Sequence, residues 1–460
     1  GYGMESVQID GNNLLSVYDT IKGVRDYCAR YQKPYLVECI TFRMRGHEEA
    51  SGTKYVPKKL FELWEMKDPV RNYEQYLLSS GVLKAEDIEN IKNGYKEKIE
   101  RELETGFNTS PVIADTETEL EDIYAKHSVS SIQHPTSSIH QDLRLIDAIK
   151  QGLRQSMQHH PNLILMGQDI AEYGGAFKIT EGFVEEFGKA RVRNTPLCES
   201  AIVGAALGLS LEGYKSMMEM QFADFVTVGF NQIINNLAKI HYRWGQNADV
   251  VIRMPTGGGV GAGPFHSQSN EAWFVHTPGL KVVYPATPAD AKGLLIAAIN
   301  DPNPVMYFEH KALYRSVSGP VPEEYYEIEI GKARHVREGD ELSIITYGSG
   351  VHWAEDYAAE HPEISIDILD LRTLLPLDYM AIRESVQRTG RIVLLHEDTL
   401  TGGIGGEIAA WIAENCFSLL DAPVMRCASL DTPVPFSIEL ENNFLARARL
   451  DETVQKLLSY

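Results

Sequence analysis

The stretch LKVVYPATPADAKGLLIAAINDPNPVMYFEH, Leu280–His310, decides the fold class of this chain. A short apolar run, LKVVYP, is followed by the helical pattern ADAKGLLIAAIND and by a second β-rich run, PVMYFEH. Because two strands joined through a helix run in the same direction, the stretch predicts a parallel pair covered by its crossover helix. We therefore expect an α/β fold whose parallel sheet is covered on both faces, with its chemistry at the carboxyl ends of the strands.

The same rhythm extends in both directions from this stretch. Helix-like and strand-like runs alternate from Leu143 onward, and a further α/β unit follows a hairpin-like stretch near 320–335. The strands expected in these two regions are NLILMGQDI (162–170), NADVVIRMP (247–255), LSIITYG (342–348), ISIDILDL (364–371) and RIVLLHE (391–397). A small-residue helix, SAIVGAALGLSLEG (200–213), accompanies the first two. The pattern predicts two successive α/β domains.

The first 110 residues also have α/β and helical character. LLSVYDTIKGVRDYCARYQ (14–32) has apolar residues at helical spacing, and PYLVECITFRM (34–44) has the length of a buried strand. Charged amphipathic helices are expected over 58–83 and 85–107. A polar, acidic, Ser/Thr-rich stretch follows, with a weak apolar contact near Leu120 to Tyr124. We predict domains over 1–106, 141–328 and 329–460, with a linker over 107–140.

Composition limits the function classes. The 460 residues include 43 Lys and Arg against 64 Asp and Glu, so the net charge of −21 argues against nucleic acid or an anionic membrane as partner. The 5 cysteines show no C-x-x-C spacing, which indicates reduced thiols. No apolar run approaches the ~20 residues that a membrane span needs. We expect a cytoplasmic enzyme, and the opening GYGMESVQIDG suggests a fragment or a processed piece.

Three glycine-containing segments each have a structural and a functional interpretation. PTGGGVGAGPFHSQ (255–268) could cradle a phosphate, but it lacks a clean helix start and a P-loop lysine, which favours an active-site loop. TGGIGGEIAAWIAE (401–414) runs into a helix, where glycines allow close packing. Asp10 in DGNN resembles part of a magnesium motif, yet its position before a helix favours a turn or N-cap residue.

Longer strings are more specific than these glycines. In chain order they are TPLCESAIVGAALGLSLEGY, EMQFADF, HSQSNEAWFVHTPGLKVVYPATPADAKGLL, YFEHKALYR, DLRTLLPLD, HEDTLTGGIGGEI, DAPVMR and DTPVPF. Together they resemble the β subunit of thiamine-diphosphate-dependent 2-oxo-acid dehydrogenases, from about Asp142 to Tyr460. Upstream, IDGNN, LVECITFRMRGHEEASG, WEMKDPV and LEDIYA are similar to the C-terminal half of the α subunit. The sequences of four of these strings look closer to branched-chain members than to pyruvate members: PLCE, QFADF, FEHKALYR and HEDTLTGG.

The resemblance implies a fold and a reaction. The fold would be transketolase-like, with parallel sheets and a C-terminal transketolase-type α/β domain, in a fused α-then-β chain. The reaction would be oxidative decarboxylation of a 2-oxo acid, with acyl transfer to a lipoyl group on an acyltransferase core. Because sites in this family lie between subunits, a homodimer of fused chains equivalent to a heterotetramer is expected. A pyruvate or acetoin dehydrogenase component and a non-catalytic docking fragment remain the alternatives.

The resemblance also assigns roles to particular residues. Glu199 falls where the family places the carboxylate that hydrogen-bonds the aminopyrimidine of the cofactor, a task that requires a desolvated and well-aimed side chain. A helix-entry carboxylate is its alternative role. Phe225 falls where an aromatic ring stacks on the aminopyrimidine, Leu197 would contact the cofactor beside it, and Phe222 is expected in the core.

Two histidines match active-site histidines of the family. His266 in PFHSQS would assist substrate binding and proton transfer around decarboxylation. His47 in RMRGHEE would serve the reductive acylation of the lipoyl group. As single loop histidines, both could also be ordinary hydrogen-bonding residues.

The magnesium site departs from the family pattern. The family binds the cofactor diphosphate and Mg²⁺ through a G-D-G…N motif, and this chain contains no G-D-G. We therefore nominate no metal ligand here and expect the Mg²⁺ ligands in an upstream segment or on another chain.

Overall fold

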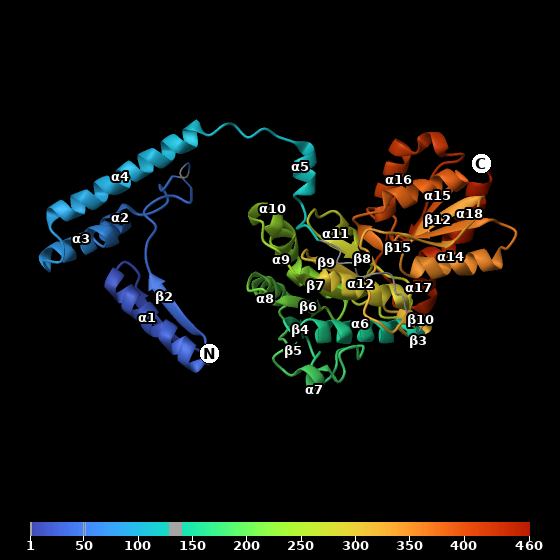
Figure 1. The fold of residues 1–460 in the computed structure, drawn as a ribbon, viewed down its shortest axis with the longest axis horizontal. Helices are drawn as coiled ribbons and strands as arrows, with labels where there is room; N and C mark the ends of the chain where they lie inside the picture. The colour runs from blue at the N-terminus through green and yellow to red at the C-terminus, as the bar shows by residue number, and fades with distance from the viewer. Residues whose placement is uncertain (1, 49, 51, 128–139) are drawn as a thin grey trace. The chain divides into compact units, whose positions relative to one another are not determined.

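The computed structural model describes residues 2–48, 50, 52–127 and 140–460, which form two compact units, Gly1–Ile113 and Ala114–Tyr460. Figure 1 shows the elements of each unit in chain order, from blue at the N-terminus to red at the C-terminus. Within the described residues, no helix has the length and apolar character that crossing a membrane requires. All five cysteines are free, as their spacing predicts.

The first unit pairs a small sheet with four helices: β1 (Glu5–Asp10), α1 (Leu14–Tyr31), β2 (Tyr35–Ile40), α2 (Lys58–Glu65), α3 (Pro69–Ser79) and α4 (Ala85–Asn108). The side chain of Asn13 caps α1 by accepting a hydrogen bond from the N–H of Ser16. Asp10 accepts from the N–H of Asn12, which confirms its role as a turn residue. The helical region 58–83 is divided because Asp68 caps a new helix with Pro69 at its first position.

The expectation that 34–44 forms a buried strand is wrong for this unit. β2 is shorter, and it pairs in parallel only with β1 among the described strands. Leu36 and Ile40 are exposed, although α1 packs against both strands of this two-stranded sheet.

The second unit contains a seven-stranded sheet in the order β14-β8-β9-β7-β6-β4-β5. All neighbours are parallel except β14 and β8. The strands are β4 (Leu163–Gly167), β5 (Val192–Asn194), β6 (Lys215–Glu219), β7 (Val250–Thr256), β8 (Lys281–Val283), β9 (Val305–His310) and β14 (Thr373–Leu375). β5, β6 and β14 were not expected from the sequence pattern, because they are short or lie next to stronger signals.

The predicted strand–helix–strand unit is confirmed. β8 and β9 are parallel neighbours joined by α12 (Pro288–Asn300), whose first turn is capped by the side chain of Thr287. Nearly every residue of α12 is buried, because one side covers the sheet and the other packs against α6 (Leu145–His159). The small-residue helix α8 (Glu199–Leu211) packs on β6.

A five-stranded sheet follows, in the order β11-β13-β12-β15-β16. Its strands are β11 (Arg334–Arg337), β12 (Leu342–Thr346), β13 (Ile366–Asp370), β15 (Ile392–Thr399) and β16 (Met425–Ser429). β11 is antiparallel to β13, and the other pairs are parallel. The helices that accompany this sheet are α14 (Ser349–Glu360), α15 (Tyr379–Thr389), α16 (Ile404–Asn415), α17 (Ile438–Phe444) and α18 (Leu450–Leu458).

The stretch near 320–335 does not form a local hairpin. β10 (Ser318–Pro322) instead pairs antiparallel with β3 (His140–Arg144), which lies at the other end of the first α/β region. The partner of β10 is therefore set by tertiary packing, which brings the two ends of this region together.

The segment 114–127 contains α5 (Thr116–Glu121) and then packs against the rest of the second unit. The hydroxyl of Tyr124 donates to the carbonyl of Leu280 at 2.9 Å, and the backbone of Ala125 exchanges two hydrogen bonds with the side chain of Asn303. The segment makes local contacts near Tyr124 as expected, but the contacts described are hydrogen bonds, whereas the sequence predicted an apolar contact, and Leu120 itself is exposed.

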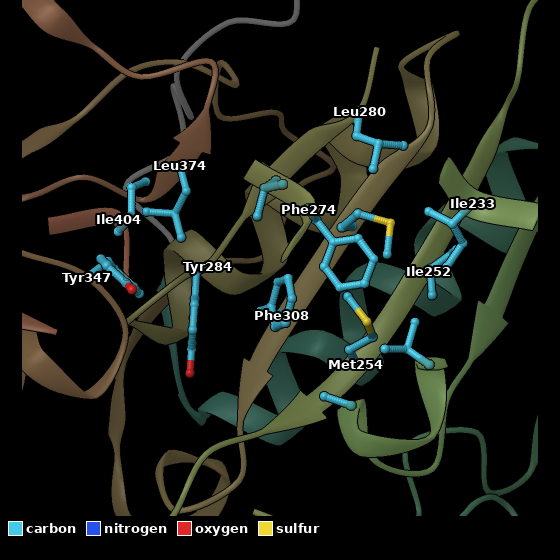
Figure 2. Packing of buried hydrophobic residues seen from close by; sticks show 14 of the residues in the cluster. Ile233, Ile252, Met254, Phe274, Leu280, Tyr284, Phe308, Tyr347, Leu374 and Ile404 are labelled. Atoms are coloured by element: carbon cyan, nitrogen blue, oxygen red, sulfur yellow. The ribbon is translucent and has the colours of Figure 1, made fainter. Parts of the chain in front are cut away.

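One apolar cluster connects the two sheets. Figure 2 shows Phe274, Met254 and Phe308 packed together at the seven-stranded sheet. Beside Tyr284 it shows residues of the C-terminal region such as Leu374 and Tyr347. Tyr284 stacks on Phe308 at a centroid distance of 5.6 Å. The two α/β regions therefore share a core, which fixes loops of one against loops of the other.

Shorter helices complete the second unit: α7 (Phe183–Phe187), η1 (Ala223–Gly229), α9 (Phe230–Asn235), η2 (Leu237–Lys239), α10 (Ile240–Trp244), α11 (Ala272–Val275), α13 (Leu313–Ser316), η3 (Phe417–Leu419) and η4 (Ala446–Arg449). Among these, the 3₁₀ helix η1 and the loop before α11 form part of the site described next.

Candidate active site

Glu199 is the first residue of α8, and its side chain is buried, with the residue 7% exposed. The following sequence, SAIVGAALG, is rich in small residues, so neighbouring elements can approach α8 closely. A Cβ placed on Gly229, at the end of η1, would lie 3.1 Å from a methyl group of Val203 and 3.5 Å from the carbonyl oxygen of Glu199. The start of α8 is thus packed closely against η1, and the Glu199 carboxylate lies at the N-terminal end of the helix.

Gln168 fixes the Glu199 carboxylate. It follows β4, and its Nε2 donates to Oε1 of Glu199 at 2.7 Å. The amide oxygen of Gln168 is buried and has no hydrogen-bond partner among the described residues. A carboxylate and a free amide acceptor therefore lie side by side, which suits a ligand edge that carries both a hydrogen-bond donor and a group exchanging a proton.

Three aromatic rings gather beside η1. The His266 ring meets Phe222 edge-on at a centroid distance of 4.7 Å, and it meets Phe225 at 5.6 Å. Phe222 also contacts Phe177 at 5.7 Å. Phe222 is only partly buried, so its expected role as a core residue is wrong: it packs against the candidate active-site histidine instead.

Polar contacts tie the loop that carries His266 to η1. Oδ1 of Asp224 accepts hydrogen bonds from the backbone N–H and from Nε2 of Gln268, the latter at 3.0 Å. The side chain of Asn270 donates to the carbonyl of Ala223 at 3.0 Å. These bonds lie on the carboxyl side of His266 and hold its loop against the element that carries Phe225.

A buried ion cluster joins the strands beneath this site. Arg253 of β7 donates to Glu219 of β6 at 2.7 Å and makes two bonds to Glu309 of β9, one of 2.5 Å and one of 2.8 Å. The hydroxyl of Tyr314 also donates to Glu309 at 2.6 Å. Burial raises the pKa of Glu219, while the nearby Arg253 guanidinium opposes this shift. Removing one of these charged side chains would leave an unpaired buried charge. The cluster therefore fixes the positions of these three strands.

The structure places the five predicted site residues as follows. Glu199, Phe225 and His266 lie in the second unit, on elements that contact one another around η1. Leu197 precedes α8 and is 81% exposed, which leaves its side chain free to contact a ligand. His47 lies in the first unit, exposed in the loop after β2.

The residues present fit the pyrimidine side of thiamine diphosphate. Glu199 supplies a buried carboxylate, the amide oxygen of Gln168 is an unsatisfied acceptor beside it, and Phe225 supplies a half-buried aromatic face. The described residues contain no cluster of three or more His, Cys, Asp or Glu side chains suited to a metal ion.

Sequence reasoning missed several residues that organise the site: Gln168, Asp224, Gln268, Asn270, Glu397 and Glu441. A polar residue directly after the buried run LILMG was a usable signal for Gln168, because parallel strands bring their carboxyl ends to one edge of the sheet. No local pattern identified Glu397 or Glu441, because the backbone N–H groups that they bind, those of Gly258 and Gly259, lie more than a hundred residues away.

Comparison with known proteins matches three segments of the chain to domain families. Residues 1–110 match the dehydrogenase E1 component, residues 141–317 the pyrimidine-binding domain of transketolase, and residues 331–449 the transketolase C-terminal domain. A solved structure described as a split-gene transketolase, an inactive β4 tetramer, aligns with 69% of the chain and 98% of its own length at a TM-score of 0.57. Its sequence identity of 22% supports the transketolase-like fold alone.

The curated relatives are β subunits, and each matches about two thirds of this chain. The β subunit of 2-oxoisovalerate dehydrogenase from Bacillus subtilis is 45% identical over 320 residues, covering 68% of this chain and 98% of the relative. The pyruvate dehydrogenase E1 component β subunit from the same organism is 43% identical, with 69% and 99% covered. A mitochondrial 2-oxoisovalerate dehydrogenase β subunit 2 from Arabidopsis thaliana is 44% identical, with 65% and 84% covered. The chain belongs to the family of thiamine-diphosphate-dependent 2-oxo-acid dehydrogenase E1 components.

Proposed function

We propose that this chain is the decarboxylating component of a branched-chain 2-oxo-acid dehydrogenase complex, with an α-like part fused ahead of a β-like part. The observation that carries the proposal is the buried Glu199, held by Gln168 at the start of α8, which packs against η1, the element that carries Phe225. Support for the branched-chain type comes from the relatives named for 2-oxoisovalerate. A pyruvate substrate is the second candidate, because the pyruvate dehydrogenase relative is almost equally similar.

When bound, thiamine diphosphate supplies the carbon nucleophile and the electron sink for decarboxylation. Glu199 holds a proton at the aminopyrimidine edge and shares it with the ring nitrogen. Gln168 keeps the carboxylate aimed, and Phe225 presents its ring to the face of the aminopyrimidine. Leu197 contacts the cofactor next to Glu199.

His266 orients the 2-oxo acid and moves a proton at the substrate oxygen during decarboxylation. His47 serves the later transfer of the acyl unit to a lipoyl group of an acyltransferase core. Mg²⁺ and the diphosphate would be held by residues of a G-D-G segment supplied from outside this sequence. The working assembly would be a homodimer of fused chains in the cytoplasm.

Turnover with an artificial electron acceptor tests the proposal and ranks its substrates. The chain would be assayed with thiamine diphosphate and Mg²⁺, alone and with an added chain that carries the G-D-G segment. A higher kcat/KM for 3-methyl-2-oxobutanoate than for pyruvate supports the branched-chain assignment, and the reverse order favours the pyruvate alternative. If calorimetry detects no cofactor binding in either mixture while the acyltransferase core is still bound, the chain is a docking fragment and the catalytic proposal fails.

A further inference from the structure

Carboxylates of the C-terminal α/β region bind the backbone of the glycine-rich loop after β7. Oε1 of Glu397 accepts the N–H of Gly258 at 2.6 Å. The two oxygens of Glu441 accept the N–H groups of Gly259 and Gly261, each at 2.9 Å. The N–H groups of this loop thus bind two side chains that are distant from the loop in sequence. Glu397 belongs to β15, and Glu441 belongs to the short helix α17.

The conformation of the loop explains why these N–H groups converge. Gly257, Gly259, Gly261 and Gly263 all have positive φ, between 66° and 88°. Glycines in such conformations turn successive N–H groups to one side of the chain, and this concave arrangement binds anions. Here the anion is a protein carboxylate, so the loop that could have held a phosphate is already occupied by Glu441.

Both carboxylates are buried and well satisfied. Glu397 is 5% exposed and also accepts from His310 at 2.6 Å and from the hydroxyl of Ser349 at 2.9 Å. Burial by itself would raise the pKa of Glu397, but its hydrogen-bond partners, His310 first, lower the pKa to about 2. Glu441 is 2% exposed. Hydrogen bonds to ionised acceptors are about twice as strong as neutral ones.

The same segment also covers the loop sterically. A Cβ on Gly258 would lie 3.3 Å from both Oε1 of Glu441 and a methyl group of Leu445, and a Cβ on Gly263 would overlap the ring of Phe436. In addition, Nζ of Lys311 donates to the carbonyl of Gly257 at 2.7 Å. The backbone from Gly257 to Gly263 is therefore fixed at several points.

His266 follows this fixed segment by three residues. On its other side, Gln268 and Asn270 are bonded to η1. The imidazole ring is thus held between two anchors, one in the C-terminal region and one in η1, and it meets the Phe222 ring at 4.7 Å. Releasing the first anchor would leave the histidine attached on one side only.

We propose that Glu441 is a positioning residue: by binding the N–H groups of Gly259 and Gly261, it keeps His266 against Phe222 and Phe225. The C-terminal region then helps to determine the catalytic geometry of the pyrimidine-binding region. The catalytic consequence rests on the proposed function, whereas the effect of Glu441 on the loop and on the His266 ring does not.

Amide hydrogen exchange tests the contact between Glu441 and the loop independently of catalytic activity. Glu441→Ala should speed exchange of the Gly259 and Gly261 amides at least tenfold, and Glu441→Gln, which keeps one acceptor oxygen, should give a smaller increase. Glu439→Gln on the same helix is the matched control, since its exposed side chain bonds only to Ser437 among the contacts described. Unchanged exchange in Glu441→Ala would overturn the proposal.

A double-mutant cycle separates positioning from general stability. In the holoenzyme, Glu441→Gln should lower kcat/KM by about tenfold to a hundredfold, the order expected for a misplaced catalytic group. In a His266→Ala background it should cause no further loss, because the group being positioned is gone. Equal losses in both backgrounds would show a purely structural role and overturn the proposal. Cofactor affinity should be the same in all four proteins.

The imidazole signal of His266 distinguishes failure of this proposal from failure of the proposed function. In protein labelled at histidine, the signal missing from His266→Gln identifies this residue. It should shift in Glu441→Gln and stay in place in Glu439→Gln, whether or not the protein decarboxylates a 2-oxo acid. An unshifted signal in Glu441→Gln overturns the positioning role, while inactive wild-type holoenzyme overturns only the proposed function.

Discussion

Two features of Glu199 suit its proposed role: the residue is buried, and its carboxylate accepts a hydrogen bond from Gln168. Its carboxylate starts α8, and Gln168 donates to it at 2.7 Å. Because the side chain is buried at a helix start, a change of charge there affects the site more than a change on the surface.

Replacing Glu199 with Gln should preserve the fold and abolish most activity. The amide keeps the shape but cannot exchange a proton with the aminopyrimidine, so kcat should fall by about 10²- to 10⁴-fold. Steady-state turnover of the 2-oxo acid, with circular dichroism as a check on folding, measures this effect. Glu212→Gln, exposed at the other end of α8, is the control and should retain full activity. More than a tenth of wild-type kcat in Glu199→Gln would contradict the assignment.

Asp398 should make stability depend on pH. Burial raises the pKa of this carboxyl to about 7, with Glu397 adding to the rise and the N–H of Thr399 opposing it. Since the unfolded value is about 3.9, the folded state binds the proton more tightly. The stabilisation is complete below about pH 4 and is lost as pH rises through 7.

Asp398→Asn should therefore be more stable than wild type at pH 8, on the order of 1 to 3 kcal/mol, because it removes a buried charge and keeps an acceptor for Thr399. Urea midpoints at pH 5 and pH 8 measure the effect. The difference between the variant and wild type should grow with pH, and parallel pH curves would disprove the role of Asp398.

At the scale of elements, two neighbouring glycines of α16, Gly405 and Gly406, differ in the space around them. A Cβ on Gly405 would lie 2.7 Å from Nε2 of the buried His396, whereas a Cβ on Gly406 would meet only Nη1 of Arg426, at an ordinary 3.6 Å. The expectation that glycines in TGGIGG allow close packing is therefore confirmed at Gly405.

Alanine at these two positions should have opposite effects. Helix propensity alone favours Ala over Gly by about 1 kcal/mol. Gly406→Ala should be neutral or stabilising, whereas Gly405→Ala should be destabilising by about 1 to 3 kcal/mol because it overpacks the contact with His396. Thermal unfolding of the two variants checks the sign. A stabilised Gly405→Ala would show that α16 can move away from β15 at little cost.

At the scale of the second unit, β14 connects the two α/β regions. It lies in the C-terminal part of the sequence, yet it pairs with β8 at the edge of the seven-stranded sheet. Leu374 of this strand is fully buried in the cluster that both regions share. The two regions should therefore unfold together.

Leu374→Ala should destabilise both regions at once, by about 2 to 5 kcal/mol, because it leaves a cavity in the shared core. Hydrogen exchange under mild denaturant should show faster opening in β8 and β9 as well as in β12 and β15. Leu440→Ala, at an exposed position of α17, is the control and should have little effect. Faster exchange confined to one sheet would show that the two regions unfold independently.

The sequence by itself determined the α/β class and the succession of the main strands along the chain, and it nominated Glu199, Phe225 and His266 as site residues. These follow from local periodicity and from long characteristic strings, which do not depend on distant contacts. Short strands such as β5 and β14 were not recognisable, because three residues carry too little periodic signal.

Only the tertiary structure decided which distant segments complete each sheet and each site. The pairing of β10 with β3, the insertion of β14 beside β8, and the binding of Glu441 to Gly259 and Gly261 join residues far apart in the chain. Hydrogen-bond partners at such separation leave no local pattern, since they are chosen by the packing of whole elements around a shared core. The sequence therefore identified the groups of the candidate site, whereas the fold decided what holds them.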